Sequence, residues 1–215
     1  LRAVMDDLGG GVYALGVMTP DDALALVAEQ LRWSPEVDGD REWVDELIAG
    51  VGRHPLALSV ALGILRREGH YPSEWRDSAA RIVASVGSGR NLDHLQLETA
   101  DREHNVEAVL AISYDVLVPE DRRLLRSLGA FALEAEFTTA QAALCWECEP
   151  EAARRHLVDF ANAALVTRVD EQAWRQHALL RGYCLAWLHA AGEYEQAAYR
   201  HAVAYNTAMR QADDA

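Results

Sequence analysis

Apolar residues recur at helical spacing along most of this 215-residue chain. The first of these stripes consists of Leu24, Val27, Ala28 and Leu31. A spacing of three and four residues places such side chains on one face of an α-helix. Residues 56–65 are apolar nearly all round, as is typical of a helix at the centre of a small bundle. The pattern predicts a mostly α fold whose first unit, residues 19–88, is a four-helix bundle.

Local signals mark where individual elements begin. Thr19, followed by proline and two aspartates, predicts a helix start, and Thr138 with Gln141 has the spacing of a capping box. The apolar run VYALGV at residues 12–17 predicts a short strand. These signals are local, so they indicate element boundaries without indicating how the elements pack.

The period changes late in the chain. After a charged connection at residues 89–104, helical spacing resumes in a second unit, residues 105–190. Near its end the stretch ALVTRVDEQAWRQH alternates between apolar and polar residues, which predicts a β-hairpin. Helices followed by a hairpin indicate a winged-helix domain. Residues 191–215 predict one more helix, of the kind that precedes or starts a tetratricopeptide array.

The charge of the chain excludes several function classes. The formal net charge is −14, and all 20 basic side chains are arginines. Without lysine there is no Schiff-base lysine, lysine general base or phosphate-loop lysine. The acidic balance argues against a nucleic-acid or anionic-membrane surface. No apolar run reaches the roughly 18 to 20 residues of a membrane span, and three cysteines indicate a reducing, cytoplasmic compartment.

The cysteine pair in CWEC has the spacing of redox and zinc sites. A zinc site needs two further ligands, and only His156 and Cys184 are candidates near Cys145 and Cys148. A thioredoxin-like site needs the pair after a strand, whereas this pair ends a helix pattern. We therefore interpret the cysteines as packing residues and predict no metal site and no catalytic residue.

Arginine groups outside that motif have ordinary interpretations. Arg154, Arg155 and Arg168 are the candidates for contacts with DNA phosphates, but the acidic residues around them argue against a basic face. Arg66 and Arg67 are expected on an exposed helix face, paired with nearby acids.

The stretch GRHPLAL, residues 52–58, leaves two interpretations open. Proline is tolerated in the first turn of a helix, so Pro55 can be a helix initiator. Alternatively, the glycine-to-proline stretch presents bare backbone and a rigid apolar ring to a ligand.

Four segments, taken in chain order, resemble the NB-ARC branch of the STAND signalling ATPases. They are VYALGVMTPDDALALVAEQL, GRHPLAL, ISYDVLVPEDRRLLRSLGAFALEAEFT and WRQHALLRGYCLAWL. The resemblance implies that residues 1–18 end a nucleotide-binding core, that residues 19–88 are a helical ARC1 domain and that residues 105–190 are a winged-helix ARC2 domain. The phosphate loop would precede Leu1, so we expect a lid fragment that is not itself an enzyme, within a longer P-loop ATPase switch.

The resemblance also assigns site residues. Pro55, with Gly52 and Leu56 of the G-x-P-L motif, would lie beside the adenine of ADP, and His177 would reach the β-phosphate. Only the histidine of the M-H-D motif is present, because Gln176 and Ala178 replace its neighbours. ADP or ATP would be the cofactor of the longer protein and would not bind this fragment tightly. The expected partners are the upstream core, the downstream repeats and further copies in an active oligomer.

Two other function classes remain open at this point. One is a winged-helix DNA-binding regulator, and the other is a helical scaffold with no ligand. The scaffold would be favoured if Pro55 and His177 lay on different faces of the fold. The nucleotide-switch hypothesis therefore predicts that these two residues converge.

Overall fold

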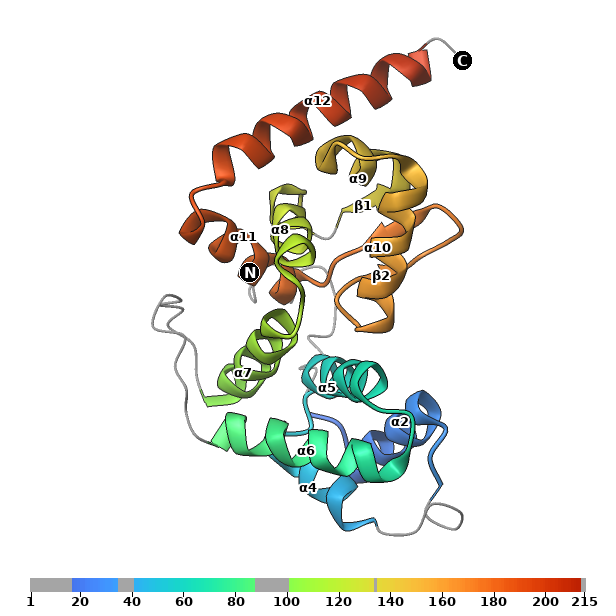
Figure 1. Ribbon diagram of the computed structural model, residues 1–215, viewed down its shortest axis with the longest axis vertical. Helices are drawn as coiled ribbons and strands as arrows, with labels where there is room; N and C mark the ends of the chain where they lie inside the picture. Colours follow the sequence, from blue (N-terminus) through green and yellow to red (C-terminus); the bar gives the residue numbers. More distant parts are fainter. Residues whose placement is uncertain (1–16, 35–40, 88–100, 134, 214–215) are drawn as a thin grey trace, which may run out of the picture.

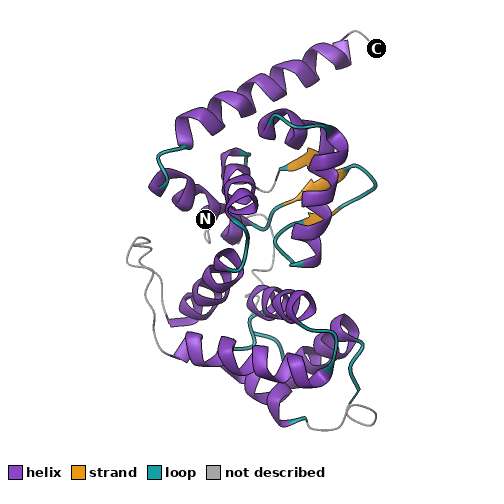
Figure 2. Cartoon of the chain, viewed as in Figure 1, coloured by secondary structure: helices purple, strands orange, loops and turns teal. Residues whose placement is uncertain are grey.

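The computed structural model describes residues 17–34, 41–87, 101–133 and 135–213 (Figure 1). These residues are mostly α-helical, with one small antiparallel sheet of three strands (Figure 2). The strand predicted at residues 12–17 lies outside the described residues except for Val17, which has no regular structure. None of the described helices combines the length and apolar character that a bilayer crossing requires.

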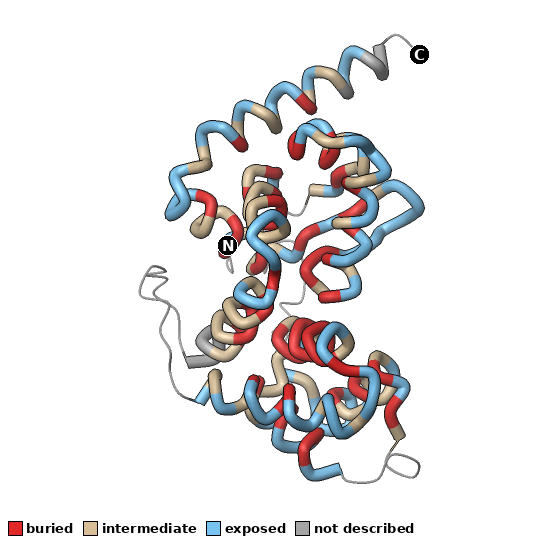
Figure 3. The backbone as a smooth tube through the Cα atoms, viewed as in Figure 1, coloured by how far each residue is buried: buried red, intermediate tan, exposed pale blue. Residues whose placement is uncertain are grey.

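Four helices near the start of the chain pack together. They are α2 (Pro20–Leu31), α4 (Glu42–Gly50), α5 (Pro55–Glu68) and α6 (Pro72–Gly87). The hydroxyl of Thr19 accepts a hydrogen bond from the Asp22 N–H (3.1 Å), so the predicted cap of α2 is confirmed. Burial is concentrated on α5 (Figure 3), which contacts α2, α6 and the following helix α7. The nearly all-apolar helix is thus the most buried of the four.

Helix α7 (Asp101–Asp115) packs with these helices, although the predicted division placed residues 105–115 in the second unit. It packs against α5 and α6, and we call α2, α4, α5, α6 and α7 the first helical group. Its first residues lie inside the predicted connection, residues 89–104, because α7 begins at Asp101. The last turn of α7 reaches the other half of the molecule, where Tyr114 stacks on Trp187 with ring centroids 4.2 Å apart.

The second group contains the sheet and the helices around it. It consists of α8 (Pro119–Ser127), the 3₁₀ turn η1 (Leu128–Ala130), β1 (Glu136–Thr138), α9 (Thr139–Trp146), α10 (Pro150–Asn162), β2 (Thr167–Arg168), β3 (Ala173–Arg175) and α11 (Ala178–Ala190). The predicted hairpin is present as β2 and β3, which pair antiparallel. The strand order of the sheet is β1-β3-β2, so β3 is the central strand of the sheet. The predicted capping box at Thr138 is confirmed as well.

Helix α12 (Tyr194–Asp213) closes the described chain. It packs on α9 and η1, and two ion pairs hold it there, Arg126 with Glu193 and Arg200 with Glu147. The Arg126 guanidinium lowers the pKa of the Glu193 carboxyl below its usual value. The start of α12 is therefore fixed to α8 electrostatically.

The two groups meet where α5 crosses the turn after α10. A Cβ atom at Gly63 would lie 2.6 Å from the carbonyl carbon and oxygen of Ala163, so only glycine permits this approach. Three residues further along α5, Arg66 donates a hydrogen bond to the carbonyl oxygen of Asn162. This contact forms one end of the space between the groups.

Candidate ligand-binding groove

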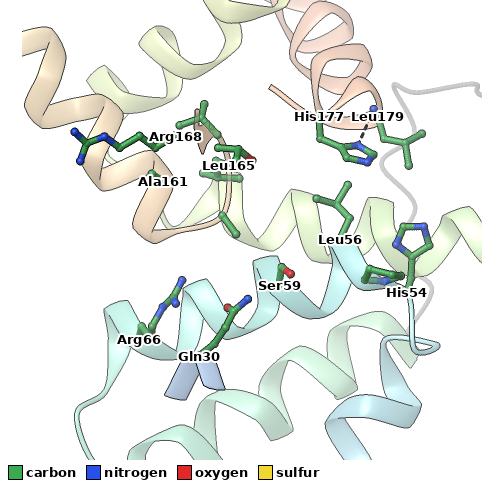
Figure 4. A pocket seen from close by; sticks show the side chains of 14 residues that line it. Gln30, His54, Leu56, Ser59, Arg66, Ala161, Leu165, Arg168, His177 and Leu179 are labelled. Carbon is green, nitrogen blue, oxygen red and sulfur yellow. Dashed lines mark hydrogen bonds between the residues drawn. The ribbon is translucent and has the colours of Figure 1, made fainter. Parts of the chain in front are cut away.

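A groove of about 770 Å³ lies between the first helical group and the second group (Figure 4). Its volume is in the range of sites for small molecules and cofactors. From the first group it is lined by Gln30, His54, Pro55, Leu56, Ser59 and Arg66, and from the second by Ala161, Ala164, Leu165, Val166, Thr167, Arg168, His177 and Leu179.

The groove brings together three of the four residues predicted from the sequence. Pro55 is the first residue of α5, Leu56 follows it, and His177 immediately precedes α11. Two helices thus begin at this end of the groove. Helix N-termini carry unpaired N–H groups and partial positive charge, so this end is suited to an anionic group.

Gly52 is the predicted residue that does not line the groove. It has a φ of +66°, and Arg53 after it has a φ of +56°. A Cβ atom at Gly52 would lie 2.7 Å from the amide nitrogen of Asn105 on α7. Its conformation and its close contact with α7 both require glycine. Gly52 therefore shapes the turn that presents Pro55.

His177 is exposed and caps α11. Its Nδ1 accepts a hydrogen bond from the Leu179 N–H (3.2 Å). A ring nitrogen that accepts carries no proton, so the proton of the neutral ring is on Nε2, which is a donor. Gln176, before it, is buried and its amide donates to the Sγ of Cys184 (3.2 Å). The local structure therefore holds the histidine at the start of α11, with its Nε2–H bonded to none of the described residues.

Sequence reasoning missed the other end of the groove. Arg66 was expected to be exposed and paired with an acid, but it is half-buried and lines the groove. Burial lowers the pKa of its guanidinium. Its position four residues after Leu62 places it next to the buried side chains of α5, but no pattern within α5 indicates the groove. Gln30 lies beside Arg66 (Figure 4), and Ser59 and Thr167 line the groove from α5 and β2.

The electrostatic character of the groove is opposite to that of the chain. Two arginines and two histidines line it, and none of the described lining residues is acidic. The whole sequence carries 34 acidic residues against 20 arginines. Positive and hydrogen-bond-donating groups have therefore gathered where the two groups face each other.

The structure describes the three cysteines and His156, the candidate ligands around the CWEC motif. Burial raises the pKa of the Cys145 and Cys184 thiols to about 12, and it also raises that of Cys148. The ring of His156 is bonded to Asp121 (Nδ1 to Oδ1, 2.9 Å). Among the residues that the structure describes, no cluster of histidine, cysteine or carboxylate side chains could hold a metal ion.

The candidate DNA contacts lie among acids. Arg154 and Arg168 line a depression beside α10 together with Glu151 and Glu171. Arg155 is exposed nearby. A mixed surface of this kind lacks the basic face that duplex DNA requires.

No protein-family model and no curated protein matches this sequence. Any assignment of function therefore depends on the residues of the groove and on the resemblance described above.

Proposed function

We propose that this chain is the lid region of a nucleotide-controlled switch of the NB-ARC type. The observation that supports the proposal most strongly is that Pro55 and His177, far apart in the sequence, line one groove. A scaffold with no ligand gives no reason for these two motifs to meet. In the proposed switch, both residues contact ADP held by a nucleotide-binding core that precedes this chain.

The arrangement of elements agrees with this proposal. From α8 to β3 the chain runs helix, strand, two helices and two strands, with sheet order β1-β3-β2. That order supports interpretation of the second group as a winged helix. The contacts of α2 with α4 and α5, and of α6 with α4 and α5, support interpretation of residues 19–88 as the ARC1 bundle.

Each contact has a physical basis. Pro55 and Leu56 offer a stiff apolar wall for a purine, and the Nε2–H of His177 can donate to a phosphate oxygen. The N-terminus of α11, beside His177, favours the negative charge of the phosphates. The chain has no lysine for a phosphate loop, so most of the phosphate-binding energy would come from the core.

The first test uses this chain. We expect weak ADP binding, in the millimolar range or weaker, and no ATP hydrolysis. In an NMR titration the resonances of Leu56 and His177 should shift. The variant His177→Ala should reduce the binding, whereas His70→Ala, at an exposed position outside the groove, should not. Tight ADP binding by titration calorimetry, or shifts confined to other surfaces, would overturn the proposal.

The second test uses the longer protein that carries the core. A two-state switch requires that the nucleotide bind its states with different affinity. We expect His177→Ala to speed ADP release or to cause constitutive assembly. An unchanged rate of ADP release together with unchanged basal assembly would contradict the assignment.

A salt-dependent DNA-binding assay distinguishes the competing class. A winged-helix regulator should bind duplex DNA with an affinity that falls steeply as salt rises. Because acids surround Arg154 and Arg168, we expect no such binding.

A further inference from the structure

The groove is longer than the contacts proposed for the nucleotide. Pro55 and Arg66 both line it and are 11 residues apart on α5, which corresponds to about 16 Å at 1.5 Å per residue. Pro55 and His177 account for one end only. The other end, where Gln30 and Arg66 lie (Figure 4), has no role in the proposed switch.

Arg66 lacks the usual partner of a half-buried arginine. Its one hydrogen bond among the described residues goes to the carbonyl oxygen of Asn162, and no described carboxylate pairs with it. A guanidinium has five N–H donors in a planar fork. Most of that donor capacity is thus unused by the part of the chain that the structure describes, although burial makes hydration of the group less favourable.

Other arginines of the chain differ from Arg66. Arg66 and its neighbour Arg67 both line a second depression together with Asp121 and Asp159, but Arg67 is exposed, whereas Arg66 is half-buried and also lines the groove. Arg168 lines the same groove, but its Nε donates to the carbonyl oxygen of Asp170 (2.9 Å), and its guanidinium lies over the Trp174 ring. Arg66 is therefore the guanidinium at this end that remains available to a ligand.

Neutral polar groups accompany Arg66. Figure 4 shows Gln30 and Arg66 extending toward the cavity from α2 and α5. The side-chain oxygen of Gln30 is buried and accepts no hydrogen bond from the described residues, so a ligand hydroxyl would be bound through the amide N–H groups of this side chain, which donate. Ser59 faces the cavity from α5 and Thr167 lines it from β2. Their hydroxyls can donate to an anion from both walls.

We propose that this end of the groove binds a small phosphate monoester, with the phosphate on Arg66 and a hydroxyl of the ligand on Gln30. A planar fork together with hydroxyl donors suits the several acceptor oxygens of a phosphate. Such a ligand contacts both groups and therefore stabilises the arrangement in which they face each other. The site is formed by this chain alone and does not depend on the proposed nucleotide switch.

The test uses ribose 5-phosphate as the probe, with ribose as its uncharged counterpart. In titration calorimetry at low salt, ribose 5-phosphate should bind and ribose should not. The variant Arg66→Gln should weaken binding about tenfold or more, because it removes a charge-assisted bond. The matched control Arg67→Gln, one residue away, should leave the affinity within about twofold, which is within the worth of an exposed charge.

A second variant tests the proposal if Arg66→Gln fails to fold. Thr167→Val changes an exposed position. It should weaken binding about fivefold, because it removes one hydrogen bond to the ligand. Undetectable binding to the wild type, or equal binding to Arg66→Gln and wild type, would overturn the proposal. Loss of binding in His177→Ala but not in Arg66→Gln would also overturn it, because the phosphate would then lie at the opposite end. That last outcome would leave the nucleotide proposal intact.

Discussion

Replacing Gly63 with alanine tests how closely the two groups are joined. The added methyl group would lie 2.6 Å from the carbonyl carbon and oxygen of Ala163, whereas ordinary contacts begin at 3.4 Å. The distance must therefore lengthen by about 0.8 Å. The neighbouring atoms are backbone, so no change of side-chain rotamer relieves the overlap. The two groups must move apart, or α5 must shift.

The magnitude follows from two opposing effects. Overpacking of a close contact costs about 1–3 kcal/mol. Alanine in a helix interior is more favourable than glycine by about 1 kcal/mol. Gly182, within α11, is also helical, but a Cβ atom there would meet nothing within 4 Å. Gly182→Ala therefore shows the propensity gain alone.

Urea denaturation of both variants separates the two effects. Because the propensity gain is common to both, their free energies of unfolding should differ by the overpacking cost, about 1–3 kcal/mol, with Gly63→Ala the less stable. Equal stabilisation by both substitutions would refute the reasoning. It would mean that the contact between α5 and Ala163 is loose in solution.

Two further predictions concern the second group. At pH 8 a thiol reagent should label Cys148 in the folded protein and spare Cys145 and Cys184. Burial raises the pKa of the Cys145 and Cys184 thiols to about 12, so little thiolate forms there at this pH. Mass spectrometry would show which cysteines are labelled, and rapid labelling of all three would contradict the prediction. Because Arg126 lowers the pKa of Glu193 in the folded state, the stabilisation is present above the usual value of 4.5 and is lost as the pH falls. Glu193→Gln should therefore cost about 1 kcal/mol at pH 7 and make acid unfolding less steep, whereas an unchanged acid limb would exclude this contribution.

Much of the secondary structure could be predicted because its causes are local. The caps at Thr19 and Thr138 depend on residues within one turn, and both form as expected. The hairpin follows from alternation between neighbouring residues. Helix α7 begins before the predicted boundary. The prediction missed its first turn because Asp101 to Asn105 are polar and give no apolar stripe.

The groove was only partly predictable. The meeting of Pro55 and His177 depends on long-range packing, and only the resemblance to a known family led us to expect it. Arg66 was assigned to the surface because arginine is usually exposed and paired. Its burial depends on the turn after α10, where Asn162 accepts its hydrogen bond. No pattern within α5 indicates that this turn lies opposite.

The stacked rings of Tyr114 and Trp187 give the molecule an internal reporter. Tyr114 belongs to a helix packed within the first group, while Trp187 lies on α11 of the second. A rotation of one group against the other that does not carry the end of α7 with it must separate this pair. The indole emission of Trp187 should then change, so a variant that keeps only this tryptophan would display domain movement optically, without an attached dye.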